Sequence, residues 1–182
     1  MPRLTPLDPA TATGEAKELL AGIQAAFGMT PNMARTMARN PAVLKGWIEL
    51  NSALAKTLTR QLSEQIAVAI AEANRCGYCL SAHTAIGGLV GIDQHELTKS
   101  RDGESSDAKT AAALRFAQTV NDKRGDVSDE DLGAVRAAGY DDADIAAIVG
   151  HVALNVLTNY FNLVARPVID FPEVSPRMAK AA

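Results

Sequence analysis

The stretch that decides the fold of this 182-residue chain is residues 58–87, which read LTRQLSEQIAVAIAEANRCGYCLSAHTAIG. Its apolar residues recur every three or four positions, which is the period of an amphipathic helix rather than of a strand. Thr59 is a capping residue and opens a predicted helix over residues 59–74. A second helix is predicted over residues 76–87, and a cluster of glycines is expected to end it: Gly87, Gly88 and Gly91.

The rest of the chain carries the same helical punctuation. Aromatic residues make up only 4% of it, and no long stretch alternates β-branched with polar residues, so strands have little support. Capping residues followed by apolar residues at helical spacing predict further helices. Five of these helices are expected over residues 13–28, 41–54, 106–120, 128–139 and 141–165, and two short helices are expected to begin at Pro31 and at Asp93. Capping boxes are expected at Asp93–Glu96, Ser128–Asp131 and Asp141–Asp144.

These elements predict an all-α protein. We expect a single-domain bundle of about eight helices over residues 1–165. We expect residues 166–182 to form a C-terminal arm, because three prolines prevent the last helix from continuing. The arm contains Val168, Ile169 and Phe171, so we expect it to pack on the body of the protein or on a neighbouring subunit.

Composition and charge exclude several classes of function. A net charge of −3 and a sequence pI near 5.6 provide no basic surface for nucleic acid. The first residues, MPRLTPLDPATAT, lack the apolar core of a signal peptide, and the longest apolar run, Ile66–Ala71, is too short to span a bilayer. Two cysteines are too few for a secreted disulfide scaffold. The expected protein is soluble and cytoplasmic, with no membrane or nucleic-acid partner.

The two cysteines and one histidine form the motif that carries chemistry. Cys76, Cys79 and His83 are spaced C-x-x-C-x-x-x-H, which places two thiols and an imidazole on one helix face. A cysteine in the first turn of a helix is exposed to unpaired N–H groups and to the positive end of the helix dipole, and both favour the thiolate. An imidazole four residues later can accept the thiol proton. The pattern therefore indicates a reactive thiol.

Glu64, on the preceding predicted helix, is a second candidate. Ala67, Val68 and Ala71 share its side of that helix, and a carboxylate among such neighbours is costly to bury unless it has a partner. This unusual setting makes Glu64 a candidate proton-relay group.

Each of these residues also has a simpler interpretation. The cysteines could form a structural disulfide, or could bind zinc together with His83, although neither His95 nor His151 has a spacing that suggests the fourth ligand. His83 could be an ordinary hydrogen-bonded histidine, and Glu64 a solvated helix residue. His151, in a mostly apolar helix, is expected to be a hydrogen-bonded core or interface histidine. A thioredoxin motif is excluded because its C-x-x-C follows a strand.

The whole pattern resembles the carboxymuconolactone decarboxylase superfamily, specifically its AhpD-like alkylhydroperoxidase branch. The signature is a glutamate twelve residues before C-x-x-C and a histidine four residues after it, here Glu64, Cys76, Cys79 and His83. Three further stretches resemble peroxidase-related proteins of that branch: TGEAKELL, FGMTPNMARTMARNPAVL and VALNVLTNYFNLVARPVIDFP. The family is all-α, in agreement with the helix pattern.

The resemblance implies a thiol-dependent peroxidase that reduces hydroperoxides through a dithiol/disulfide cycle. Cys79 would attack the peroxide and Cys76 would resolve the resulting sulfenic acid. His83 and Glu64 would form the proton relay. No cofactor or metal is implied. The implied partners are a hydroperoxide, a dithiol reductant such as a lipoyl or thioredoxin-like protein, and further copies of the chain in a dimer, trimer or hexamer.

One position departs from the family pattern. Founding AhpD proteins have histidine just before the second cysteine, whereas this chain has Tyr78, and tyrosine, whose ordinary pKa is about 10, is a poor base at neutral pH. Two other functions remain open. One is a noncatalytic oligomeric protein that binds zinc or senses redox state. The other is a decarboxylase, for which two cysteines have no evident use.

Overall fold

The computed structural model describes residues 1–177, which contain nine helices and no strand. The all-α prediction is therefore confirmed, with nine helices in place of about eight. The helices are α1 (Gly14–Phe27), α2 (Asn32–Met37), α3 (Pro41–Leu54), α4 (Arg60–Ala73), α5 (Gly77–Leu89), α6 (Gln94–Ser100), α7 (Ala108–Asp122), α8 (Asp129–Ala137) and α9 (Asp142–Ala165).

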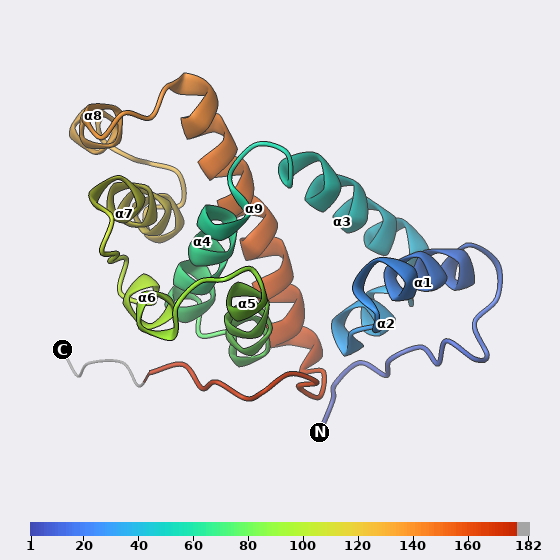
Figure 1. Ribbon diagram of the computed structural model, residues 1–182. Coiled ribbons are helices and arrows are strands. Elements are labelled where there is room, and N and C mark those ends of the chain that lie inside the picture. Colours follow the sequence, from blue (N-terminus) through green and yellow to red (C-terminus); the bar gives the residue numbers. More distant parts are fainter. Residues whose placement is uncertain (178–182) are drawn as a thin grey trace.

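The helices are arranged around α4. Helix α4 packs against α5, α7 and α9, while α1–α3 lie together at one end of the molecule and α7 and α8 at the other (Figure 1). Helix α9 runs through the middle and contacts α3, α4, α5 and α7. Two long segments that are far apart in sequence, α4 and α9, therefore hold the two ends of the molecule together.

Two groups of buried side chains form the core. We call the first the cysteine cluster; it joins α1–α3 to α5 and one side of α4. Its buried members are Ala12, Ala16, Leu20, Ile23, Met33, Ala34, Met37, Ala38, Leu44, Val68, Ala71, Cys76, Tyr78, Cys79, Leu80 and Leu97. We call the second the scaffold cluster; it joins the other side of α4 to α7, α8 and α9. Its buried members are Leu62, Ile66, Ala69, Ile70, Ala113, Leu114, Phe116, Ala117, Val120, Val135, Tyr140, Ile148 and Val152.

Helix α5 extends further than its glycines suggested. It begins at Gly77, with Cys76 as its N-cap, and passes through Gly87 and Gly88 to Leu89. The prediction that Gly87 and Gly88 end the helix is therefore wrong. A Cβ atom on Gly87 would lie 2.6 Å from a methyl carbon of Leu97, so this glycine lets α6 pack closely against α5. The turn after the helix uses Gly91, whose φ of +84° suits glycine.

The predicted capping boxes are present in two places out of three. Ser128 with Asp131 and Asp141 with Asp144 close both hydrogen bonds of the box, at the starts of α8 and α9. At α6 only Asp93 caps the helix, through His95 N–H. The carboxylate of Glu96 instead accepts hydrogen bonds from Ser105 and Ser106, and these bonds, Ser106 first, lower the pKa of Glu96 to about 2.

Helix α9 is long and apolar enough, by length and composition alone, to cross a membrane. The sequence argument from continuous apolar runs missed this, because Gly150, His151 and Asn155 interrupt the apolar residues. Half of the most apolar window of α9 is buried inside the protein, and core helices of soluble proteins meet the same criterion.

Beyond α9 the chain is extended and lies against α4–α6. It turns at Arg166, whose φ is +48°, and then runs beside α5 and α6 (Figure 1). Val174 N–H donates to Ser81 Oγ of α5 at 2.9 Å, and Arg101 after α6 donates to the carbonyl of Ser175 at 3.0 Å. Within the predicted arm, residues 178–182 lie outside the described residues.

Candidate active site

Both cysteines lie at the beginning of α5. The two sulfurs form a disulfide, and Cys76 and Cys79 are only 1% and 2% exposed. Cys76 Sγ accepts the N–H of Cys79 at 3.2 Å and so caps the helix. The chain leaves α4 with the left-handed φ of +55° at Arg75, which starts α5 in a new direction. The sharp turn between two helices therefore brings the C-x-x-C into the core.

The sulfur of Cys79 has a partner that the sequence analysis missed. Asn162 of α9 donates its side-chain N–H to Cys79 Sγ at 3.3 Å. Asn162 is 4% exposed, and its carbonyl Oδ1 has no hydrogen-bond partner among residues 1–177. The available signal was a buried amide on the inner face of an apolar helix, but nothing local connects it to a cysteine 83 residues away.

Glu64 and His83 are brought together by the packing of α4 on α5. His83 Nδ1 and Glu64 Oε2 are 2.8 Å apart, and the two side chains are 25% and 15% exposed. Glu64 is thus a partly buried carboxylate with a specific partner. Donation from Nδ1–H to the carboxylate leaves Nε2 as the ring's acceptor. With the disulfide closed, no hydrogen bond within residues 1–177 joins this imidazole to either sulfur.

Tyr78, between the two cysteines, ties the site to the C-terminal segment. Its hydroxyl donates to Asp170 Oδ1 at 2.7 Å and accepts the N–H of Met33 at 3.1 Å. Its ring packs edge-on against Phe171, with ring centroids 5.8 Å apart. Burial above all, and then Asp170, raise the pKa of Tyr78 well above its ordinary value. Tyr78 is therefore a neutral hydrogen-bonding group and not a base.

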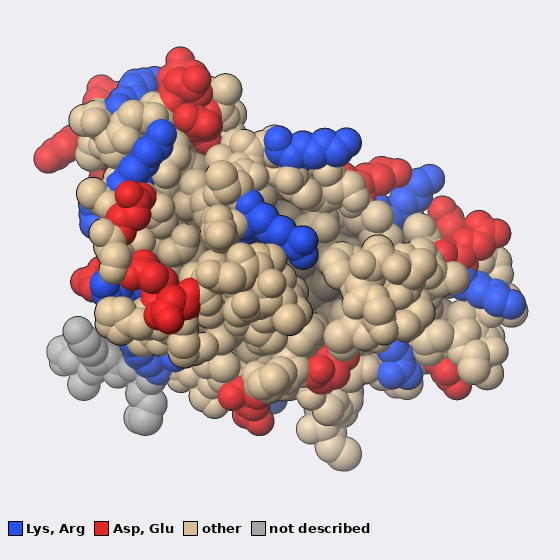
Figure 2. Space-filling view, in the orientation of Figure 1, with Lys and Arg blue, Asp and Glu red and all other residues tan. Residues whose placement is uncertain are grey.

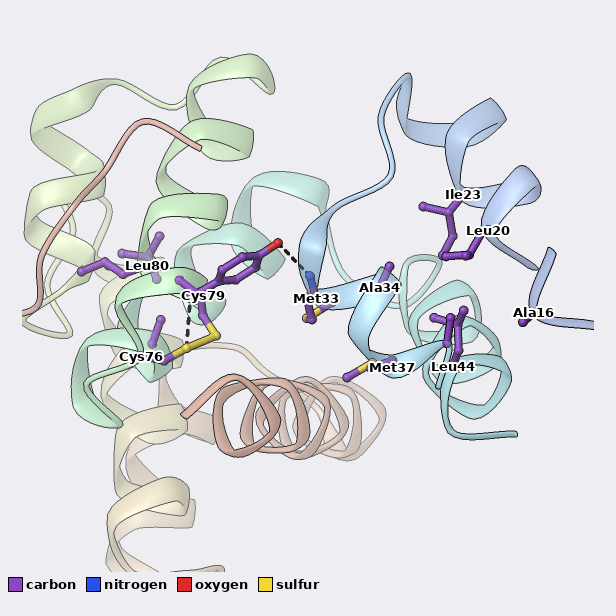
Figure 3. Close-up of a cluster of buried hydrophobic side chains, with 14 of the residues drawn as sticks. Ala16, Leu20, Ile23, Met33, Ala34, Met37, Leu44, Cys76, Cys79 and Leu80 are labelled. Atoms are coloured by element: carbon purple, nitrogen blue, oxygen red, sulfur yellow. Dashed lines mark hydrogen bonds between the residues drawn. A yellow bond between two sulfur atoms is a disulfide. The ribbon is translucent and has the colours of Figure 1, made fainter. Parts of the chain in front are cut away.

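Asp170 also reaches the first residue of α2. Its Oδ2 accepts the N–H of Asn32 at 2.7 Å, so one carboxylate joins the C-terminal segment to α2 and, through Tyr78, to α5. Across the cysteine cluster from the labelled cysteines, Figure 3 shows Ala34, Met37 and Leu44 of α2 and α3. The C-terminal segment, α2 and α5 are thus connected to one another around the buried disulfide.

The remaining histidine of interest, His151, is separate from the sulfurs. It is buried on α9, and its Nε2 lies 3.2 Å from the carbonyl of Leu54 and 3.3 Å from Thr57 Oγ1. Burial lowers the pKa of His151, so the neutral ring holds the end of α3. This is the hydrogen-bonded core histidine that the sequence predicted.

The described part of the chain contains no group of three or more His, Cys, Asp or Glu side chains placed to hold a metal ion. On the face shown in Figure 2, positive and negative side chains are interspersed, and a hollow with few charged walls lies between α5 and the α1–α2 pair.

Comparison with known proteins agrees with this fold and motif. Residues 41–122 match the model of the carboxymuconolactone decarboxylase family. This match and the solved structures described next support placing the chain in that superfamily, in its AhpD-like branch. Among curated protein sequences, none matches the chain at a significant level.

The particular relatives are solved structures. A peroxidase-related protein from Ralstonia eutropha JMP134, described as an alkylhydroperoxidase AhpD core, is 25% identical over 91% of this chain and 92% of its own, with a TM-score of 0.81. A peroxidase-related protein from Silicibacter sp. TM1040 is 23% identical over 91% and 92%, with a TM-score of 0.77. The debrominase Bmp8, solved with 2,3,4-tribromopyrrole, is 20% identical over 92% and 91%, with a TM-score of 0.78. The similarities to the Silicibacter protein and to the debrominase show the fold alone. The family match and the first of these relatives suggest that the chain is an enzyme.

Proposed function

We propose that this protein is a thiol-dependent peroxidase that reduces hydroperoxides with Cys79 and Cys76. The observation that carries the proposal is that α5 holds both sulfurs and, four residues after Cys79, the imidazole that is hydrogen-bonded to Glu64. A nucleophile, a base and a group that orients the base are the parts that thiol catalysis needs.

In the first half-reaction, neutral His83 accepts the proton of the Cys79 thiol, and Glu64 stabilises the imidazolium that results. The thiolate attacks the terminal oxygen of the hydroperoxide. The S–O bond forms as the O–O bond breaks, and the alkoxide leaves with the proton returned by His83. The products are an alcohol, or water from hydrogen peroxide, and the sulfenic acid of Cys79.

In the second half-reaction, the Cys76 thiol loses its proton and its sulfur attacks the sulfenic sulfur; hydroxide leaves as water by taking up a proton, which gives the disulfide seen in the structure. A dithiol reductant then exchanges with that disulfide and restores both thiols. A lipoyl or thioredoxin-like protein supplies such a dithiol. A cytoplasmic location suits the cycle, because dithiol reductants are kept reduced there.

Association with copies of the same chain is part of the proposal, and α9 supports it. Its exposed residues include Val149, Leu157, Tyr160 and Val164, and residues 145–165 contain no charged side chain. A two-fold interface sets a patch against itself, so a charge-free apolar patch meets no repulsion there. Light scattering after size-exclusion chromatography tests it: Leu157→Lys should lower the measured mass, and a monomeric wild type would contradict the idea.

The test of the peroxidase proposal is a hydroperoxide-consumption assay on the reduced protein, combined with thiol counting and metal analysis. We expect peroxide loss to accompany the loss of two thiols per chain, and reduced lipoyl or thioredoxin-like protein to restore both. Peptide mass spectrometry should place the product bond between Cys76 and Cys79.

Two outcomes would replace the proposal with another function. Stoichiometric zinc together with unreactive thiols would indicate the noncatalytic protein. Thiol oxidation by 2,3,4-tribromopyrrole but not by hydroperoxides would indicate a thiol-dependent dehalogenase, since a debrominase shares this fold.

A further inference from the structure

We infer that Asn162 stabilises the thiolate of Cys79 and so makes it, rather than Cys76, the nucleophilic cysteine. The inference deepens the proposed function, on which it rests, because it concerns the same thiol. It starts from the contact between Asn162 Nδ2 and Cys79 Sγ at 3.3 Å.

The two sulfurs receive different donors. At the start of α5, the N–H of Cys79 donates to the sulfur of Cys76 at 3.2 Å. Helix capping alone would therefore favour a thiolate on Cys76. The donor for Cys79 comes from a different helix, α9. Local structure favours one cysteine, and the tertiary contact favours the other.

The burial of Asn162 gives the contact its significance. Its carbonyl oxygen is buried without a partner among the described residues, and an unsatisfied buried amide is costly. A leucine of similar size at this position would avoid that cost. A disulfide sulfur is only a weak acceptor, whereas a thiolate in a buried site is a strong one. The hydrogen bond from the Asn162 amide is therefore strongest when Cys79 is reduced and charged.

The hydroxyl of Tyr78 and the imidazole of His83 have partners other than sulfur. The hydroxyl of Tyr78 bonds to Asp170 and Met33, and His83 faces Glu64. Asn159, one turn before Asn162, accepts a hydrogen bond from Asn74 through Oδ1, while its Nδ2 has no partner among residues 1–177. Among the described side chains, the amide of Asn162 is the one that donates a hydrogen bond to the sulfur of Cys79.

The experiment measures ionisation of one thiol and does not require peroxidase activity. In a Cys76→Ser background, only Cys79 reacts with iodoacetamide, and the alkylation rate against pH gives the midpoint of its ionisation. Asn162→Leu should move that midpoint upward by about one pH unit, which lowers the thiolate fraction about tenfold at a pH below both midpoints. The matched control is Asn155→Leu, also a buried amide on α9, whose Nδ2 donates to a backbone carbonyl and not to sulfur.

A second measurement needs no change at Asn162. In ¹⁵N-labelled Cys76→Ser protein, the side-chain amide resonances of Asn162 should titrate with the Cys79 midpoint, and those of Asn155 should not. An unmoved Asn162 amide, or equal midpoints in the Asn162→Leu and control proteins, would overturn the inference. A shifted midpoint without peroxide turnover would instead refute the proposed function and leave the role of Asn162 intact.

Discussion

The cysteine cluster and the scaffold cluster share α4 but differ in the polar groups around them. The cysteine cluster contains two sulfurs and Tyr78, and α9 adds the amide of Asn162. It is closed by α2, α9 and the C-terminal segment. The scaffold cluster is built almost entirely of apolar side chains from α4, α7, α8 and α9. Capping boxes lie at the starts of α8 and α9, and Lys109 Nζ lies over the ring of Tyr140, 4.6 Å from its centroid.

The two clusters are therefore stabilised in different ways. In the scaffold cluster, removal of apolar surface from water holds the helices together, and the polar groups remain at helix ends. In the cysteine cluster, buried hydrogen bonds connect segments that are far apart in sequence, as Tyr78 does with Asp170 over 92 residues. We expect changes in the first region to alter stability alone, and changes in the second to alter the thiols as well.

The largest effect should come from the cysteines themselves. Cys79→Ser should abolish peroxide turnover, because serine cannot form the sulfenic acid. Cys76→Ser should let sulfenic acid form on Cys79 but stop the cycle after one turnover, as a sulfenic-acid trapping reagent followed by mass spectrometry can check. Sulfenic acid on Cys76 in the Cys79→Ser protein would mean that the two roles are reversed.

A matched pair of leucines tests the comparison of the two clusters directly. Leu114→Ala, in the scaffold cluster, and Leu80→Ala, next to Cys79, each remove a fully buried side chain. Each should lower the free energy of unfolding by about 2–5 kcal/mol, measured by urea denaturation. Only Leu80→Ala should change the rate of thiol alkylation. If Leu114→Ala changed that rate equally, the two regions would not be separable.

Tyr78→Phe should have a smaller effect on stability. It removes the hydroxyl that joins Asp170 to Met33 and leaves buried groups without a partner, which should cost about 1–3 kcal/mol of unfolding free energy. The C-terminal segment should also become more sensitive to limited proteolysis. Thr98→Val, which removes a hydroxyl at an exposed position of α6, is the control and should change stability by no more than about 0.5 kcal/mol. Equal stability and equal protease sensitivity of the two variants would contradict the idea that the Tyr78 hydroxyl holds the C-terminal segment in place.

Glu64→Gln should have the smallest effect in free energy while leaving the fold intact. Loss of the carboxylate that orients His83 should slow peroxide consumption at pH 7 by at least about tenfold. The loss should be partly recovered at higher pH, where Cys79 ionises without help. Rates are measured by stopped flow, with Glu104→Gln as a surface control. An unchanged rate and pH profile would remove Glu64 from the mechanism.

Much of the secondary structure could be predicted from local patterns. Asn40 and Pro41 start α3, and Ser128 with Asp131 starts α8, because a cap involves residues only a few positions apart. The errors arose where packing overrides a local signal. Gly87 continues the helix so that Leu97 can approach, and Glu96 leaves its expected box because Ser105 and Ser106 of a later loop bind it.

In the candidate site, too, some features follow from local sequence and others from tertiary packing. The sequence by itself determined that Cys76, Cys79 and His83 share one helix face, since the helical period sets that geometry. It also singled out Glu64, as a carboxylate among apolar neighbours. Only the tertiary structure decided that Glu64 meets His83, since that contact depends on how α4 packs on α5.

Only the tertiary structure decided, too, that Asn162 and Asp170 belong to the site. Their partners lie 83 and 92 residues away in the chain, and neither residue type differs locally from a helix amide or an exposed loop carboxylate. Local propensity acts over a few residues, whereas these contacts exist because hydrophobic burial brings α9 and the segment after it against α5. The sequence therefore determined the reactive motif, and packing determined what surrounds it.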